Sequence, residues 1–170
     1  ASDVTGVGTA RRYLAAASYG VGLAIFAYGS TPGDGYTYVS LKNLINSSGV
    51  VAADVTGVGT ARAFLGAAGY GGDKAIFAYG KDSTIYNMSN LVNSSGVVAS
   101  DVTGVGTARG QLAATVFGGD KGMFGYGSAS GAAFSSMTNI VSNTGVVAAD
   151  VTGVGSGRND LAASGFSTSA

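Results

Sequence analysis

Short apolar runs alternate with turn-forming residues along the whole chain. The runs are rich in small, β-branched or aromatic residues, which is typical of strands. Between them lie Gly-rich or Asn-rich segments such as Gly71–Lys74 and Asn46–Gly49, whose residues adopt the positive φ of tight turns at low cost. The pattern predicts strands at Leu14–Ala17, Ala24–Tyr28, Leu44–Asn46 and Val50–Val55 and at the corresponding later positions.

The Ala-rich run Leu14–Ala17 also fits a turn or two of helix. Glycines on both sides limit such a helix to a length that is marginally stable in water. We therefore favour a strand, because Ala and Gly side chains let sheets pack closely face to face.

The pattern repeats with a period of roughly 50 residues, which is typical of propellers and solenoids. Each unit opens with Asp-Val-Thr-Gly-Val-Gly, followed by an arginine eight residues after the aspartate. Residues 1–170 thus form a single repeat domain, with four strands expected in each full unit. Its units are 3–53, 54–100 and 101–149, with a half unit at 150–170.

All length variation between units falls in one segment. The intervals from Gly29 to Asn43, Gly80 to Asn90 and Gly127 to Asn139 are 14, 10 and 12 residues. Steps of two are what a β-hairpin tolerates, because an odd insertion would turn one strand inside out. We predict a hairpin of variable length in each unit.

Composition excludes several classes of function. The chain is 46% hydrophobic and 11% charged with zero net charge, so it lacks the basic patch that nucleic acid requires. No apolar run approaches the length of a membrane span. His, Cys and Glu are absent, which removes the usual general base, the thiol nucleophile and the commonest zinc ligands. We expect no enzyme activity, no cofactor and no metal site.

The recurring charged residues are interpreted as structural. Four equivalent Asp and Arg positions suit scaffolding better than catalysis, which needs one site, so we predict ion pairs or hydrogen-bonded turns between units. These residues are Asp3, Arg11, Asp54, Arg62, Asp101, Arg109, Asp150 and Arg158.

Two sets of aromatic residues are candidates for ligand binding. The variable segments hold aromatic residues that could stack on sugar rings or pair across a hairpin, since loops on a constant scaffold carry recognition. A second set recurs at equivalent positions and could ring an axial channel or pack internally. The first set is Tyr36, Tyr38, Tyr86 and Phe134, and the second is Tyr28, Tyr79 and Tyr126.

The segment from Arg62 through the turn Gly71–Lys74 to Ala75–Gly80 resembles a blade of a kelch-type β-propeller. It has an arginine, a strand of small residues, a hairpin and an aromatic strand that ends in glycine. Similar near-identical repeats occur in virion and tail-fibre-like proteins of bacteriophages. Tyr-Gly replaces the usual Gly-Gly doublet, and the blade tryptophan is missing.

The resemblance implies an all-β propeller of four-stranded blades, with about 3.5 blades in each chain. An open half blade favours a homodimer that completes a seven-bladed ring. The alternative is a closed monomer whose C-terminal segment overlaps its first strands. The expected function is that of a non-enzymatic structural or interaction module from a phage virion or an extracellular surface. The alternative is a lectin that uses repeated equivalent sites for avidity. The expected partners are a second copy and a glycan or protein.

Overall fold

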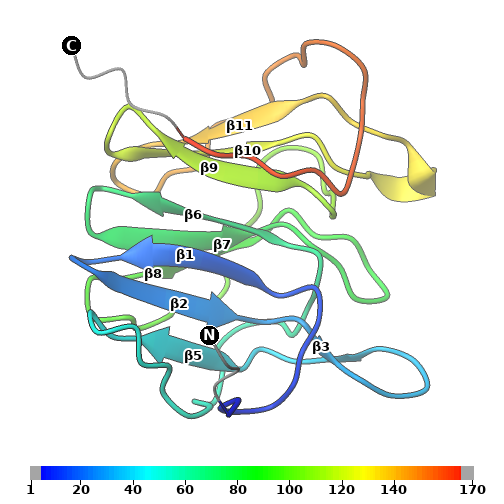
Figure 1. Ribbon diagram of the computed structural model, residues 1–170. Coiled ribbons are helices and arrows are strands. Elements are labelled where there is room, and N and C mark those ends of the chain that lie inside the picture. Colours follow the sequence, from blue (N-terminus) through cyan, green and yellow to red (C-terminus); the bar gives the residue numbers. More distant parts are fainter. Residues whose placement is uncertain (1–4, 166–170) are drawn as a thin grey trace.

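The computed structural model describes residues 5–165, which fold into antiparallel strands and one short 3₁₀ turn (Figure 1). Three sheets have three strands each, in the orders β1–β2–β5, β6–β7–β8 and β9–β10–β11, and a small fourth sheet pairs β3 with β4. The elements are β1 (Ala15–Tyr19), β2 (Leu23–Ala27), β3 (Ser30–Thr31), β4 (Thr37–Tyr38), β5 (Lys42–Ile45), β6 (Gly66–Tyr70), β7 (Lys74–Ala78), β8 (Ser89–Val92), β9 (Ala113–Phe117), β10 (Lys121–Gly125), η1 (Ser130–Ala132) and β11 (Thr138–Val141).

Each three-stranded sheet is built from one sequence unit. The first and second strands join at the predicted tight turns, where Tyr70 pairs with Lys74 and both Gly71 and Gly72 have positive φ. The Ala-rich run after Leu14 forms strand β1, so the helical alternative is wrong. The all-β prediction is confirmed for the described residues.

The prediction of four strands in each unit is wrong for the described residues: the last segment makes only two isolated bridges to the third strand, because a β-bulge interrupts their pairing. In unit 1, Lys42 pairs with Val55 and Ile45 pairs with Val51. Three steps along β5 therefore face four steps along the last segment, and the extra residue breaks the ladder. Units 2 and 3 repeat this spacing, with bridges Ser89–Val102, Val92–Val98, Thr138–Val151 and Val141–Val147.

The segment of variable length is a hairpin in every unit. Its closing pairs are Ser30 with Tyr38, Lys81 with Ile85 and Ser128 with Phe134. These pairs are 8, 4 and 6 residues apart, which matches the order and the steps of two seen in the sequence. The hairpin prediction is confirmed.

The three sheets stack on one another, with β6 packed between β1 and β9. Small residues permit the close approach: a Cβ added at Gly66 would crowd the ring of Phe124. Two apolar cores fill the spaces between sheets. The first includes Tyr28 and Phe77 and the second includes Tyr79 and Phe124.

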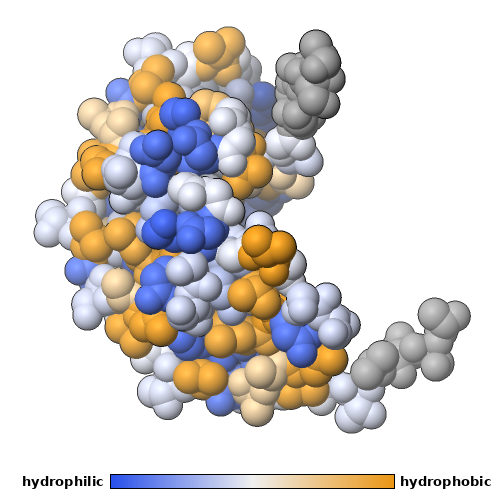
Figure 2. Space-filling view, turned by 90° about the vertical axis from the view of Figure 1, so that its left-hand side faces the viewer, coloured by the Kyte–Doolittle hydropathy of each residue, from blue (hydrophilic) through white to orange (hydrophobic). Residues whose placement is uncertain are grey.

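The stack is curved into a crescent with unit 1 at one end and unit 3 at the other (Figures 1 and 2). Residues 5–165 form an open arc, and no closed ring is completed within this part of the chain.

A column of backbone hydrogen bonds crosses from unit to unit just before each first strand. The amide of Phe64 donates to the carbonyl of Tyr13 at 3.0 Å, Gln111 donates to Phe64 at 2.8 Å, and Asp160 donates to Gln111 at 3.0 Å. All four residues have positive φ, which is uncommon for side chains other than Gly. The column fixes the position of each unit against the next.

Candidate functional site

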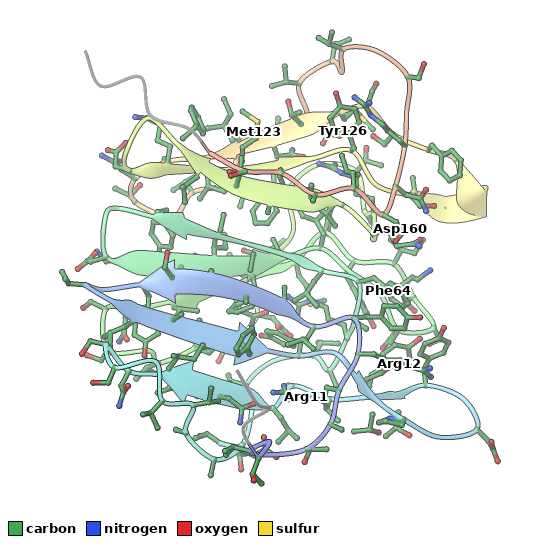
Figure 3. All side chains as sticks on the ribbon, viewed as in Figure 1. Arg11, Arg12, Phe64, Met123, Tyr126 and Asp160 are labelled. Carbon is green, nitrogen blue, oxygen red and sulfur yellow. The ribbon has the colours of Figure 1, made fainter. Side chains whose placement is uncertain are left out.

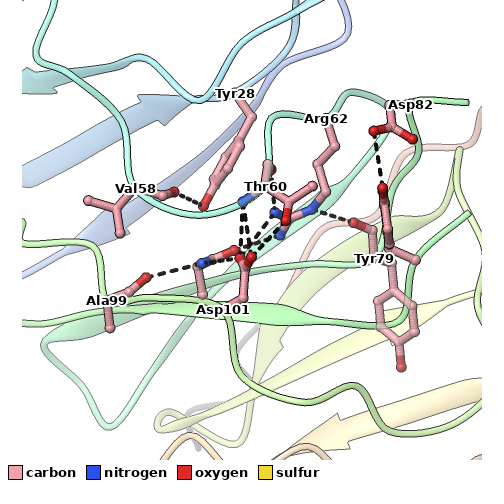
Figure 4. Close-up of polar contacts among 10 residues, drawn as sticks. Tyr28, Val58, Thr60, Arg62, Tyr79, Asp82, Ala99 and Asp101 are labelled. Carbon is pink, nitrogen blue, oxygen red and sulfur yellow. Dashed lines mark hydrogen bonds and ion pairs between the residues drawn. The ribbon is translucent and has the colours of Figure 1, made fainter. Parts of the chain in front are cut away.

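A polar cluster, here called the node, recurs in every unit (Figure 4). In unit 2, Arg62 Nη2 donates to Asn90 Oδ1 at 2.8 Å, and Asn90 Nδ2 donates to Asp101 Oδ1 at 2.9 Å. Asp101 Oδ2 also accepts from the Thr60 amide at 3.0 Å and from the Thr60 hydroxyl at 2.7 Å. The node ties the segment before β6 to β8 and to the segment after β8. The corresponding residues are Thr9, Arg11, Asn43 and Asp54 in unit 1, and Thr107, Arg109, Asn139 and Asp150 in unit 3.

Each node arginine faces the aspartate that opens the following sequence unit, rather than the aspartate eight residues before it. Arg62 Nη1 lies 4.0 Å from Asp101 Oδ1, and Arg109 Nη1 lies 3.5 Å from Asp150 Oδ1. In unit 1, Asp54 binds Thr9 and Asn43, with Arg11 close enough to influence its pKa. Arg158 lies against the ring of Tyr126. Asp3 lies outside the described residues.

Tyrosine and arginine stack across each boundary between units. The guanidinium carbon of Arg62 lies 4.5 Å from the ring centroid of Tyr28, and the Tyr28 hydroxyl donates to the Val58 carbonyl at 3.1 Å. Arg109 lies 4.5 Å from the Tyr79 ring in the same way. Tyr28 and Tyr79 are 1% and 0% exposed, so neither offers a surface for ligand stacking.

Burial and hydrogen bonding set the ionisation of the node. Burial is the largest influence on the pKa of Asp101 and raises it, but hydrogen bonds from Thr60 and Asn90 and the charge of Arg62 together hold this pKa below its usual value. Burial lowers the pKa of Arg62. Burial also raises the pKa of Tyr28 and of Tyr79 to about 12. At neutral pH the node is a charged pair with neutral tyrosines beside it.

Two glycines of the repeated phrase are required by close contacts. A Cβ at Gly57 would overlap the carbonyl oxygen of Ser40 in the preceding unit. Gly59 has a φ of +83°, and a Cβ there would collide with the side chains of Asp101 and Asn90. The phrase Thr-Gly-Val-Gly is therefore shaped by the neighbouring unit and by the node.

An aromatic cluster lies on the edge that carries the hairpins. Tyr13 stacks on Phe64 with ring centroids 4.1 Å apart, and Tyr36 stacks on Tyr38 with centroids 5.7 Å apart. The guanidinium of Arg12 lies 4.8 Å from the Tyr36 ring centroid. Tyr36 is 49% exposed and Tyr13 is 44% exposed. Figure 3 shows Arg12 and Phe64 at this edge.

The other two predicted loop aromatics lie on different hairpins. The Tyr86 hydroxyl donates to Asp82 Oδ2 at 3.0 Å within its own hairpin, and Tyr86 is half-buried. Phe134 is 59% exposed and lines a cavity of about 660 Å³ with Lys81 and Gln111. The four predicted loop residues are therefore divided among three hairpins, and only Tyr36 and Tyr38 are in contact.

The end face of unit 1 is hollow. A cavity of about 590 Å³ is lined by Arg11, Leu14, Phe26 and Val51, among others. These four residues are half-buried. Arg62, Leu65, Phe77 and Val98, which are the equivalent residues of unit 2, are all buried against unit 1.

The end face of unit 3 is partly covered by the start of the fourth repeat. Arg158 lies 4.6 Å from the Tyr126 ring centroid and donates to the Tyr126 hydroxyl at 3.1 Å. Leu161 and the following alanines line a cavity of about 360 Å³ together with Met123. Met123 and Tyr126 are half-buried.

Sequence reasoning missed Arg12, Tyr13 and Phe64, because they lie outside the variable segments. It also missed the role of the asparagines, which recur 11 residues before each aspartate, at 43, 90 and 139. The constant spacing could have indicated this role, because it places the asparagine and the aspartate at fixed positions relative to each other in every unit.

No protein-family model matches this sequence, and no curated protein matches it. Within residues 5–165, no helix has the length and apolar character needed to cross a bilayer. The same described residues contain no cluster of three or more metal-ligating side chains of the His, Cys, Asp or Glu type.

Proposed function

We propose that this protein is a non-enzymatic structural and interaction module, built as an arc of kelch-like propeller blades. The observation that carries the proposal is the contrast within each unit between a constant core and a variable hairpin. The buried node and the Tyr–Arg stack repeat with nearly constant geometry, whereas the length of the chain changes only in the hairpins along one edge. A constant core with variable loops is typical of binding scaffolds.

The chemistry of the recurring residues supports a scaffold. The carboxylate of Asp101 is engaged by Thr60, Asn90 and Arg62, and Arg62 is fully buried among backbone carbonyls and Asn90. Groups held in this way stabilise geometry and are not presented to a substrate. The resemblance of the repeats to those of phage virion proteins suggests a place in a virion or on an extracellular surface.

In this proposal the arc is completed into a ring by a second copy, as in the seven-bladed homodimer expected from the sequence. Negative-stain electron microscopy of the purified protein tests this architecture. Ring-shaped particles with a central hole are the expected result. Straight fibres, or isolated crescents at all concentrations, would contradict it.

A lectin is the second candidate, and the aromatic cluster favours it. Tyr36 and Tyr13 are exposed beside Arg12, and a stacked aromatic surface with a nearby polar group suits a sugar ring. A glycan array separates the two candidates. A blank array is expected for the scaffold, whereas reproducible hits that are lost in Tyr36→Ala but kept in Tyr86→Ala would establish the lectin instead.

A further inference from the structure

A groove separates the hairpin of unit 2 from the hairpin of unit 3. It is the cavity of about 660 Å³ described above, and its volume is within the range of small-ligand sites. Residues of hairpin 81–85 line one side and residues of hairpin 128–134 line the other. Figure 3 shows Phe64 and Asp160 along this edge, and Gln111, which also lines the groove, lies between them in the backbone column. The groove is therefore enclosed by inner parts of the arc.

The corresponding space one unit earlier is filled by tyrosines. The Tyr38 hydroxyl donates to the Asp82 carbonyl of the next hairpin at 3.4 Å, and the Tyr36 ring centroid lies 6.0 Å from that of Phe64. These two tyrosines alternate along one arm of their hairpin, so they project from the same side of an extended segment. A space of this kind therefore accommodates an extended segment with aromatic side chains.

The groove is hollow because the residues at its equivalent positions are smaller or less rigid. Ile85 closes its hairpin at the position that Tyr38 has in unit 1. Gln111 follows Phe64 in the backbone column. The hairpin of unit 2 is also shorter, with a closing pair 4 residues apart in place of 8. An aromatic side chain from outside the chain therefore has room between hairpins 2 and 3.

The groove offers a positive charge to a ligand. Of the described residues that line it, Lys81 alone is charged. Its ammonium lies 4.8 Å from the ring centroid of Phe64, and no carboxylate of the described residues forms an ion pair with it. The nearby carboxylates of Asp82 and Asp160 accept hydrogen bonds from other groups of the chain. A carboxylate on a ligand would therefore find its partner in Lys81.

We propose that this groove binds an extended peptide segment of a partner protein, which inserts an aromatic side chain beside Phe134 and Ile85 and sets a carboxylate against Lys81. This inference rests on the proposed interaction function and specifies the class of partner. The exposed ring of Phe134 gains an aromatic neighbour on binding. Hydroxyl and amide groups of the lining can satisfy the peptide backbone. They belong to Ser83, Thr84, Ser130, Gln111 and Asn159.

Isothermal titration calorimetry of the full chain with a synthetic peptide tests the proposal. The peptide copies residues 34–40, Asp-Gly-Tyr-Thr-Tyr-Val-Ser, which carry the two tyrosines of the filled space and a carboxylate. We expect saturable binding at peptide concentrations up to about 1 mM. A peptide with alanine in place of both tyrosines should bind at least about tenfold more weakly. A peptide with asparagine in place of the aspartate should bind about threefold more weakly.

Three variants of the full chain test whether the peptide lies in the groove. Ile85→Tyr fills the groove from within, in the manner of Tyr38, and should weaken peptide binding at least about tenfold. Phe134→Ala and Lys81→Gln should each weaken it about threefold to tenfold. Binding to the Lys81→Gln variant should also depend less on salt, because the ion pair is lost.

Lys121→Gln is the matched control for the lysine variant. Lys121 begins β10 and pairs with Asp120 at the turn after β9, at the opposite end of the sheets from the hairpins (Figure 1). This variant should bind the peptide as the original chain does. Circular dichroism of each variant verifies that it is folded.

The proposal is overturned if the original chain binds no peptide at about 1 mM, or if the alanine peptide binds equally well. Unchanged binding in Ile85→Tyr and Phe134→Ala overturns it as well, since the site would then lie elsewhere. Failure of peptide binding would leave ring-shaped particles in electron microscopy unaffected, and absence of rings would leave peptide binding unaffected. The two proposals can therefore fail separately.

Discussion

Arg62 carries a full charge into the interior with its side chain 0% exposed. It is held there by donation to the Tyr79 carbonyl at 2.8 Å, the Thr60 carbonyl at 3.1 Å and Asn90 Oδ1, and by the Tyr28 ring. A buried charge of this kind specifies geometry, because any packing that breaks its bonds leaves polar groups without partners.

Replacing this arginine should be costly. We expect Arg62→Ala to lower the free energy of unfolding by about 3–5 kcal/mol, because Asn90 Oδ1 and two backbone carbonyls lose their donor and Asp101 loses its ion-pair partner. Arg158→Ala is the matched control, since it alters the same repeat position where the side chain is exposed, and should cost less than about 1 kcal/mol. Equilibrium unfolding in urea measures the loss of unfolding free energy in both variants. Equal losses would show that burial of Arg62 does not account for its contribution.

The glycines of the repeated phrase allow a second test at the residue scale. Gly59 and Gly72 have nearly the same backbone, with φ of +83° and +80°, but only Gly59 faces the node. Gly72→Ala should cost about 1–2 kcal/mol for the left-handed backbone alone. Gly59→Ala should cost about 1–3 kcal/mol more, because its Cβ collides with Asp101 and Asn90. Similar unfolding midpoints for the two variants would show that the collision is relieved at no cost.

At the scale of elements, the strands and hairpins could be predicted from the sequence because they depend on neighbouring residues. Turns at Gly71–Gly72 and the variable hairpins follow from local backbone preferences and from the alternation of side chains. The β-bulge opposite β5 could not be predicted in this way. It accompanies a long-range bond from Asn43 Nδ2 to the Ala52 carbonyl at 3.1 Å, and apolar patterning does not report such bonds.

The hairpins predict how the chain tolerates changes in length. Deletion of Gly33 and Asp34 together should preserve the pairing of Ser30 with Tyr38 and leave the melting temperature nearly unchanged. Deletion of Asp34 alone should shift the register, turn Tyr36 and Tyr38 together to the opposite face of the hairpin, away from Tyr13 and Arg12, and cost about 1 kcal/mol. Near-ultraviolet circular dichroism reports the stacked tyrosines. An unaltered spectrum after the single deletion would contradict the prediction.

At the scale of the whole molecule, stability depends on contacts between units that the sequence identified only in part. The equivalence of Tyr28, Tyr79 and Tyr126 was visible in the repeat, but periodicity does not report which side of a residue is covered. That depends on how the sheets stack. The repeat also does not show that unit 1 has an open face. Arg11 and Arg62 occupy equivalent positions, but Arg11 lines the cavity on that face whereas Arg62 is buried against unit 1.

These contacts predict loss of stability at both extremes of pH. The pKa values of Asp54, Asp101 and Asp150 lie below their usual 3.8, so their contribution is complete above pH 3.8 and falls as the pH drops further. The pKa values of Tyr28 and Tyr79 are raised from 10.0 to about 12, so their contribution is complete below pH 10 and is lost as the pH rises toward 12.

Thermal unfolding measured across the pH range checks both limbs. The double variant Tyr28→Phe and Tyr79→Phe is the control, because it removes the two titrating hydroxyls and keeps the aspartates. It should lose much of the alkaline dependence and retain the acid dependence. If the fall in melting temperature at alkaline pH is unchanged in the variant, groups other than Tyr28 and Tyr79 cause it.

The backbone column at Tyr13, Phe64, Gln111 and Asp160 joins units whose other contacts are nearly interchangeable. Its hydrogen bonds are uniform, yet its side chains differ: Tyr13 stacks on Phe64, and Gln111 Nε2 donates to Asp160 Oδ2 at 3.0 Å. Aromatic therefore meets aromatic at the first step and polar meets polar at the last. The side chains at these four positions therefore differ from one junction to the next, and they can specify which unit packs against which.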